Sequence, residues 1–300
     1  MSLLASVSRT AAFIVDHPLG SRQPVRSLAI FAAWQLMSRV SRRPRIVKFA
    51  GQTRLLARAG ETGITGNIYV GLHEFTDMAF VTHALRSGDL FGDVGANAGS
   101  YTILAAGVAG ADVVAVEPVP ETLERLKANI ELNELDGRVR VCASAVGARS
   151  GTARFSCNAD TTNKFIDKNI VDNVPSMEVS VRTIDSIFER RAPEIIKVDV
   201  EGFEAEVLEG AARVLPNPAL KALVIEVLDL DVDRATGSLP VADTLASHGF
   251  DAFAYDPWTR ELVARPDGDR RGNVIFVRDV DFVRHRLAQA PRMRVRGLEI

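Results

Sequence analysis

The segment GDVGANAGSYT, residues 92–102, decides the fold, because it joins an apolar run to a helical pattern through a glycine-rich turn. Gly95 can adopt backbone angles that are closed to other residues, and Asn97 tolerates left-handed geometry. Gly99 lets the chain enter the following helix without a collision of a Cβ atom. Such a turn directs free backbone N–H groups at the start of the helix into the crevice at the strand ends. The segment therefore predicts a ligand site at the carboxyl edge of a parallel sheet.

Strand-like and helix-like patterns alternate on both sides of this turn. We expect strands at residues 90–94, 112–117, 139–146, 194–200 and 222–227, and helices at 101–109, 120–135 and 203–215. Alternation of this kind predicts a mostly parallel sheet with helices on both faces. Residues 251–255 and 273–279 read as two further strands, joined by a turn-rich segment, at one edge. The pattern predicts an α/β fold with a doubly wound sheet.

Composition and charge limit the partners. The chain has 300 residues, of which 47% are hydrophobic, and a net charge of −2. This near-neutral balance argues against a nucleic-acid partner. Cys142 and Cys157 stand alone, with no metal-binding Cys/His cluster, so we expect reduced thiols, no structural metal and a cytoplasmic protein. The longest apolar run, residues 28–37, is about half of the roughly 20 residues that a membrane span requires.

Residues 1–50 form a distinct N-terminal extension, and residues 51–300 form the main domain, with a cofactor-binding core at about 86–230. The extension predicts a helix that places four apolar residues on or near one face and is followed by basic residues: Leu28, Phe31, Trp34 and Leu36, then Arg39, Arg42, Arg43, Arg45 and Lys48. We favour a helix packed on the main domain with a solvated basic end. The alternative is peripheral membrane contact through residues 25–48. An insertion at about 151–182 is polar and predicts a small extra sheet or a flap near the site.

Two ligands fit a glycine turn at this place, a dinucleotide and S-adenosylmethionine. The dinucleotide fingerprint is GxGxxG, whereas Gly95 and Gly99 are separated by three residues. Asp93 would repel a pyrophosphate and attract the ammonium group of S-adenosylmethionine, which carries no phosphate. Glu117 ends the next strand, 18 residues after Gly99, where an acid can accept both ribose hydroxyls of either ligand. The sequence favours S-adenosylmethionine over an NAD-linked oxidoreductase or a non-catalytic cofactor-binding module.

Five segments together resemble the FkbM family of S-adenosylmethionine-dependent methyltransferases: residues 93–102, 113–133, 181–187, 194–211 and 222–227. The resemblance runs from about Leu72 to Val227, with a looser fit to Val277. It implies a class I methyltransferase fold, which is Rossmann-like and has seven strands, the last one antiparallel. It also implies O-methylation of a hydroxyl on a sugar, glycolipid or other small-molecule acceptor. The sequence carries no signal for an oligomeric state.

The expected cofactor-binding residues follow the strand ends. They are Asp93, Gly95, Asn97, Gly99, Thr102, Glu117, Pro118, Ser144 and Ala145. Ser144 and Ala145 are assigned to the adenine ring by their position in the fold alone. Asp93 as a helix cap and Glu117 as a solvated strand end are the alternatives.

Methyl transfer to an alcohol benefits from a general base, because the hydroxyl must lose its proton. Asp199 ends a strand beside the glycine turn, and Glu201 either projects to the same side or caps the next helix. His73, which the resemblance places over the cofactor cleft, is a further candidate base. Lys197 either pairs with a carboxylate or reaches the surface, and Glu226 either binds substrate or is a satisfied strand-end charge. The sequence spacing of these acids gives no support for a metal site.

Overall fold

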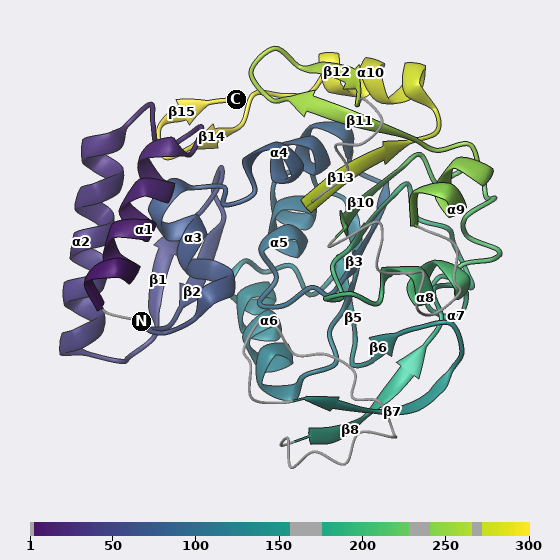
Figure 1. The fold of residues 1–300 in the computed structure, drawn as a ribbon, viewed down its shortest axis with the longest axis horizontal. Coiled ribbons are helices and arrows are strands. Elements are labelled where there is room, and N and C mark those ends of the chain that lie inside the picture. Colours follow the sequence, from purple (N-terminus) through teal and green to yellow (C-terminus); the bar gives the residue numbers. More distant parts are fainter. Residues whose placement is uncertain (1–2, 157–175, 228–240, 266–271) are drawn as a thin grey trace.

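The computed structural model describes residues 3–156, 176–227, 241–265 and 272–300 (Figure 1). Its centre is an eight-stranded sheet in the order β12-β11-β13-β10-β9-β3-β4-β5. The bounds are β3 Leu90–Val94, β4 Asp112–Val116, β5 Val139–Cys142, β9 Ile195–Val198, β10 Ala222–Val227, β11 Asp251–Asp256, β12 Glu261–Ala264 and β13 Gly272–Val277. The five strands from β10 to β5 are parallel, and β13 runs antiparallel between β10 and β11.

The expected doubly wound, seven-stranded sheet with an antiparallel last strand is confirmed, and β12 adds an eighth strand at the edge. From its sequence this stretch reads as turn-rich, because only Leu262 of β12 is buried and no apolar alternation results. The prediction of one strand over residues 139–146 is wrong, because β5 ends at Cys142 and β6 (Ala145–Val146) belongs to another sheet. The helix expected at 203–215 is shorter, because α8 spans only Glu204–Glu209.

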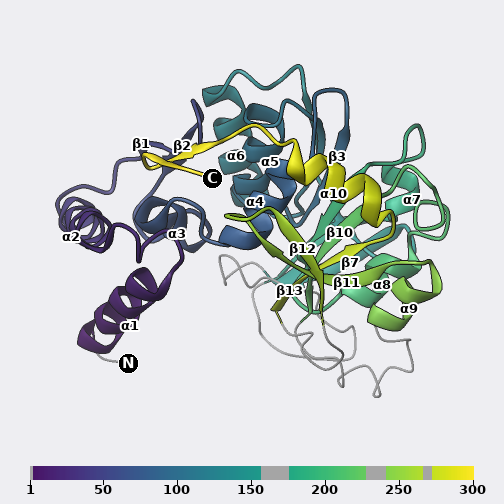
Figure 2. The same cartoon turned by 90° about the horizontal axis from the view of Figure 1, so that it is seen from above.

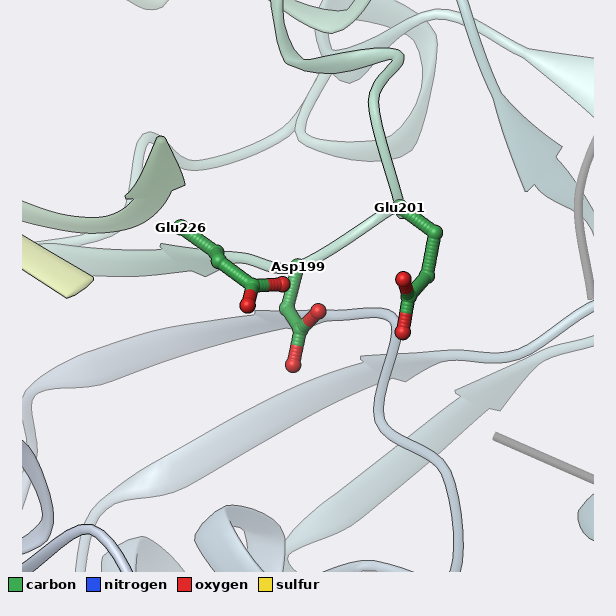
Figure 3. Close-up of side chains that lie close together, drawn as sticks. All are labelled: Asp199, Glu201 and Glu226. Carbon is green, nitrogen blue, oxygen red and sulfur yellow. The ribbon is translucent and has the colours of Figure 1, made fainter. Parts of the chain in front are cut away.

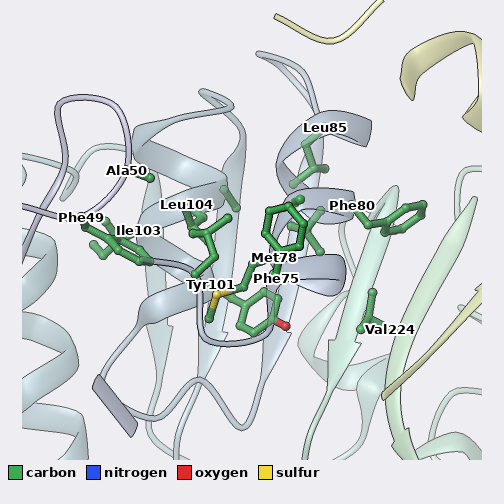
Figure 4. Packing of buried hydrophobic residues seen from close by; sticks show 14 of the residues in the cluster. Phe49, Ala50, Phe75, Met78, Phe80, Leu85, Tyr101, Ile103, Leu104 and Val224 are labelled. Atoms are coloured by element: carbon green, nitrogen blue, oxygen red, sulfur yellow. The ribbon is translucent and has the colours of Figure 1, made fainter. Parts of the chain in front are cut away.

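Two hydrophobic layers cover the sheet, one on each face. Val113 and Ala115 of β4 face one layer, whereas Val114 and Val116 face the other, as the two-residue period of a strand requires. The first layer holds α4 (Phe75–Ala84), α5 (Ser100–Gly107), α6 (Pro120–Leu132) and α10 (Val280–Ala288); part of it is shown in Figure 4. The second holds α7 (Ile184–Ile187), α8 and α9 (Val241–Ser247).

The insertion contributes a small sheet, as expected. Strands β7 (Gly151–Ser156) and β8 (Ser176–Arg182) pair antiparallel, and β6 pairs parallel with β8. Cys157 and the middle of the insertion lie outside the described residues, whereas Cys142 is a buried free thiol.

The N-terminal region packs at one end of the molecule, away from the main sheet (Figures 1 and 2). It contains α1 (Leu3–Asp16), α2 (Pro24–Val40), β1 (Arg45–Lys48), β2 (Arg54–Ala57) and α3 (Thr62–Val70). Phe31 and Trp34 of α2 are buried, as expected, but Leu36 is 65% exposed because it lies off that face of the helix. None of the described helices is long and apolar enough to cross a membrane.

The hairpin of β1 and β2 spans the expected boundary at residue 50. Ala50 also bridges to Val295 in the C-terminal hairpin, which consists of β14 (Arg294–Val295) and β15 (Leu298–Glu299). The division of the chain at residue 50 therefore stays a prediction.

Candidate active site

A cavity of about 340 Å³ opens where β3, β4, β9 and β10 end. Ten of the twelve residues expected at the site line it: His73, Asp93, Gly95, Asn97, Glu117, Pro118, Ser144, Ala145, Asp199 and Glu201. Gly99 and Thr102 do not line it: Gly99 ends the turn and faces Leu126, and Thr102 lies in α5 and binds Asp93. The fold thus gathers residues that are up to 128 positions apart into one cavity of the size that small ligands occupy.

The glycine turn has the geometry that the sequence predicts. Gly95, Asn97 and Gly99 have φ values of 79°, 50° and 93°. A Cβ atom on Gly95 would lie 1.8 Å from the backbone oxygen of Asp199, and one on Gly99 would lie 2.6 Å from Leu126 Cδ1. Gly95 is therefore required both by its backbone angles and by the close approach of the end of β9.

The backbone N–H groups of the turn are used inside the protein. Those of Gly95 and Ala96 both donate to the carbonyl oxygen of Val116, at 3.0 Å, and that of Asn97 donates to Glu117 Oε2, also at 3.0 Å. Ala98 and Gly99 donate within the turn itself. The expectation of free N–H groups in the crevice is thus wrong for residues 95–99. A pyrophosphate would find no free donor on this part of the turn.

Asp93 is 1% exposed and lines the cavity from the end of β3. Its Oδ2 accepts a hydrogen bond of 2.5 Å from the Thr102 hydroxyl, so Thr102 acts on the site through Asp93. Desolvation raises the pKa of Asp93, although the positive charge of Lys197 and the hydrogen bond from Thr102 oppose this effect. The carboxyl group therefore anchors the start of α5 and lines the cavity close to the positive charge of Lys197.

Glu117 is 6% exposed, so its interpretation as a solvated strand end is wrong. Besides the bond from Asn97, its Oε1 accepts a hydrogen bond of 2.9 Å from the backbone N–H of Val119. Desolvation raises the pKa of Glu117 to about 7. Each carboxylate oxygen keeps a second lone pair, which allows the pair of oxygens to accept two more hydrogen bonds from a ligand.

Lys197 and Asp199 form an ion pair at the end of β9, the strand beside β3, where Lys197 lies next to Asp93 in the sheet. Lys197 Nζ lies 2.6 Å from Asp199 Oδ2 and 4.8 Å from the centre of the Tyr101 ring. Desolvation opposes the charge of Asp199, but the ion pair and hydrogen bond with Lys197 outweigh it and lower the pKa. Lys197 therefore pairs with a carboxylate, and Asp199 remains ionised at neutral pH.

Glu201 and Glu226 complete a cluster of three carboxyl groups with Asp199 (Figure 3). Each can place one oxygen within 4.8 Å of the others, a proximity that the sequence spacing did not reveal. Desolvation, the charge of Asp199 and a hydrogen bond to Asp199 raise the pKa of Glu226 to about 8. Near neutral pH Glu226 therefore keeps its proton and donates it in a hydrogen bond to the ionised Asp199, and Lys197 supplies a positive charge beside the cluster.

Glu201 does not cap the following helix. It has a left-handed backbone, with φ of 56°, and lines the cavity. Among the described residues no side chain caps α8; Glu204, its first residue, instead binds the preceding loop, because its Oε1 accepts hydrogen bonds from the backbone N–H groups of Val200 and Gly202 at 3.3 and 3.2 Å. Glu201 thus lines the ligand space and does not cap α8.

Helix α3 holds His73 at the rim, a role that the sequence analysis missed. Asn67 Oδ1 accepts a hydrogen bond of 2.8 Å from the backbone N–H of His73, and Asn67 Nδ2 donates to Ser100 Oγ at 3.0 Å. A Cβ atom on Gly66 would lie 2.2 Å from the His73 ring. The glycines of the TGITGN stretch, residues 62–67, were the available signal, because they allow close packing on α3.

Known proteins with similar sequences decide the family. The Methyltransferase FkbM domain matches residues 93–252. The 31-O-demethyl-FK506 methyltransferase FkbM of Streptomyces tacrolimicus is 32% identical over 215 residues, which cover 60% of this chain and 80% of that protein. The chain belongs to the FkbM methyltransferase family. It is an S-adenosylmethionine-dependent methyltransferase, so neither the oxidoreductase nor the non-catalytic alternative holds.

One further sequence relative and one solved structure are less similar to this chain. The hexuronic acid methyltransferase AglP of Haloferax volcanii is 29% identical over 142 residues, which cover 46% of this FkbM-family chain and 56% of AglP. The solved structure of an S-adenosylmethionine-dependent methyltransferase from Agrobacterium tumefaciens has a TM-score of 0.42 at 12% identity. That match covers 78% of this chain and 69% of the other.

Proposed function

We propose that this enzyme methylates a hydroxyl oxygen of a sugar, glycolipid or other small-molecule acceptor and binds S-adenosylmethionine in the cavity at the strand ends. The observation that carries the proposal is that buried acids lie beside a glycine turn whose backbone N–H groups already donate hydrogen bonds within the protein. Such a wall suits a cationic, phosphate-free nucleoside better than a dinucleotide. Two similar proteins, named as methyltransferases of 31-O-demethyl-FK506 and of a hexuronic acid, support an oxygen-bearing acceptor.

The residues present fit this cofactor. Glu117 has free lone pairs for two ribose hydroxyls, and Asp93 supplies negative charge for the ammonium group. Pro118, Ser144 and Ala145 line the same cavity beyond Glu117, where the adenine ring would lie. Gly95 and Asn97 line the cavity, Gly99 allows the turn that places them there, and Thr102 orients Asp93. The bound cofactor would supply a methyl group on a sulfonium, which is electrophilic and carries a good leaving group.

The acid cluster and His73 would act on the acceptor. Asp199 is held in the charged form by Lys197, which makes it a weak base and a strong hydrogen-bond acceptor for the hydroxyl. An oxygen of Glu201 lies within 4.8 Å of one of Asp199, which would let Glu201 take the proton of that hydroxyl as the methyl group is transferred. His73, at the rim, is the second candidate for the proton acceptor. Alignment of the oxygen by these groups also lowers the entropic part of the barrier.

A labelled-methyl transfer screen with glycans, glycolipids and polyketides tests this function. In the Glu201→Gln variant we expect turnover to fall by about 10² to 10⁴, the range for a lost general base, while affinity for S-adenosylhomocysteine stays within about twofold. Asp199→Asn should lower turnover as well. If both variants keep full turnover, these carboxylates do not act on the acceptor.

We also propose that the acceptor is not a nucleic acid and that the enzyme acts in the cytoplasm. The net charge of −2 and the acids around the cavity disfavour a polyanion, and the buried free thiol of Cys142 suits a reducing compartment. A tRNA or rRNA transcript should accept no label in the same screen.

Peripheral membrane contact through residues 25–48 is a second proposal. Phe31 and Trp34 are used in packing, but Leu36, Val40 and Ile46 are 65%, 81% and 57% exposed beside basic residues. Exposed apolar side chains next to arginines suit an anionic lipid surface. Wild-type protein should co-sediment with vesicles of anionic phospholipid, and Leu36→Asp should abolish this. Equal sedimentation of both proteins would refute the contact.

A further inference from the structure

A second cavity, of about 440 Å³, lies beside the first and is not needed by the proposed cofactor site. His73 and Glu74 line both cavities, so the two meet at the short loop before α4. The other walls come from distant parts of the chain: residues 17–18 after α1, residues 75–77 of α4, and the strands β11 and β13.

The wall of this second cavity is polar on one side and apolar on the other. Asp77, Arg265 and Asn273 provide charged and amide groups, and Asn273 Nδ2 donates a hydrogen bond of 2.9 Å to Glu74 Oε1. The apolar part is supplied by the side chains of Phe75, Phe253 and Ile275. A ring that carries hydroxyls on its edge and C–H groups on its face matches such a wall.

The N-terminal region is part of this wall through His17. The backbone N–H of Leu19 donates to His17 Nδ1 at 3.1 Å, so Nε2 carries the proton and donates to the His73 carbonyl at 3.1 Å. Burial lowers the pKa of His17, which keeps the ring neutral. The region before residue 50 thus holds the loop at which the two cavities meet.

The two cavities together carry an excess of acidic groups. Among the described lining residues, the cations are Lys197 and Arg265, and the carboxyl groups are Glu74, Asp77, Asp93, Glu117, Asp199, Glu201 and Glu226. Lys197 is already paired with Asp199. Desolvation and the charge of Glu74 raise the pKa of Asp77 to about 6, so it is still mostly ionised at neutral pH. Even though Glu226, with a pKa of about 8, is mostly protonated at neutral pH, the remaining acids outnumber the two cations, so an anionic ligand would meet net repulsion here.

We infer that the second cavity binds the acceptor, and that this acceptor is an uncharged, hydroxyl-rich ring such as a neutral glycoside. Its target hydroxyl passes His73 and Glu74 to reach the first cavity. The inference rests on the proposed function and narrows it, because a sugar acid would place a further negative charge beside Glu74 and Asp77. The acceptor of this enzyme therefore differs in charge from the hexuronic acid named for AglP.

Saturation-transfer NMR on the full chain, loaded with S-adenosylhomocysteine, tests the inference with methyl glucopyranoside and methyl glucuronide as probes. The neutral glycoside should give a signal at least fivefold stronger than the glucuronide. Ala254→Trp, which fills the second cavity from an exposed position on β11, should weaken that signal at least tenfold. Asp251→Trp, at an exposed position of the same strand outside the cavity, is the matched control and should have no effect.

Charge is tested separately from shape. Asp77→Asn should bring the glucuronide signal to within about twofold of the neutral probe. Calorimetry with S-adenosylhomocysteine should give the wild-type affinity for all variants. Loss of this binding in the wild-type protein would refute the proposed function instead. Intact binding with no glycoside signal, an unchanged signal in Ala254→Trp, or a preference for the glucuronide would overturn the inference.

Discussion

Replacement of Glu117 by glutamine measures how the cofactor site recognises a ribose. The carboxylate accepts backbone N–H groups from Asn97 and Val119 and has lone pairs left for two hydroxyls. An amide of the same shape keeps only one acceptor oxygen. One charge-assisted hydrogen bond to the ligand, worth about 1.5–3 kcal/mol, is then lost, and affinity for S-adenosylhomocysteine should fall about 10- to 150-fold.

The pH dependence of S-adenosylhomocysteine affinity is an independent measure of the contribution of Glu117. The pKa of Glu117 is raised to about 7, and only the ionised carboxylate accepts both hydroxyls without losing a proton. Wild-type affinity should therefore rise about tenfold from pH 6 to pH 8, and this rise should vanish in Glu117→Gln. Isothermal calorimetry at both pH values measures it, with Glu121→Gln, an exposed acid on the same chain segment, as the control. A pH-independent wild-type affinity, or full affinity in Glu117→Gln, would refute the assignment.

Three further predictions concern charge, backbone and protons. Asp93→Asn should weaken S-adenosylmethionine binding at least tenfold but leave 5′-methylthioadenosine, which has no ammonium group, within about twofold by calorimetry. Gly95→Ala should lower the free energy of unfolding by more than about 3 kcal/mol in urea titrations, because its Cβ would lie 1.8 Å from the Asp199 oxygen. The pKa of Glu226 is raised to about 8, so the folded state binds this proton more tightly than the unfolded state does. The resulting stabilisation is complete below the ordinary pKa of a glutamate and is lost as the pH rises through 8. The free energy of unfolding of Glu226→Gln should therefore change less between pH 5.5 and 8.5 than that of the wild type. An equal change in the two proteins would contradict the shifted pKa.

The core of the fold could be predicted because its signals are local. Each buried parallel strand is a short apolar run. The turn has left-handed backbone angles at Gly95, Asn97 and Gly99, and glycine and asparagine are the residue types that favour such angles. The errors have the opposite cause. Strand β12 carries little hydrophobic pattern because it is an edge, and the break after Cys142 depends on β8, which follows more than thirty residues later.

The candidate site was predictable where acids end consecutive strands, as Asp93 and Glu117 do. Its other half depends on contacts that no spacing encodes. Asn67 reaches both His73 and Ser100, and Asn273 reaches Glu74 across 199 positions. The glycines of residues 62–67 indicate close packing on α3, but the partners of Asn67 and Asn273 become visible only once the chain is folded.

The contact between Gly95 and the backbone of Asp199 has a consequence for how such enzymes diversify. Since peptide groups, not side chains, set the spacing of these two segments, the methyl donor and the acids that receive the acceptor form one rigid block. A side-chain substitution can therefore hardly shift the segment at Gly95 relative to the segment at Asp199. New acceptors must then be accommodated by reshaping the outer walls, and a protein engineer should vary the residues around Ala254 and Asn273 while leaving the inner block untouched.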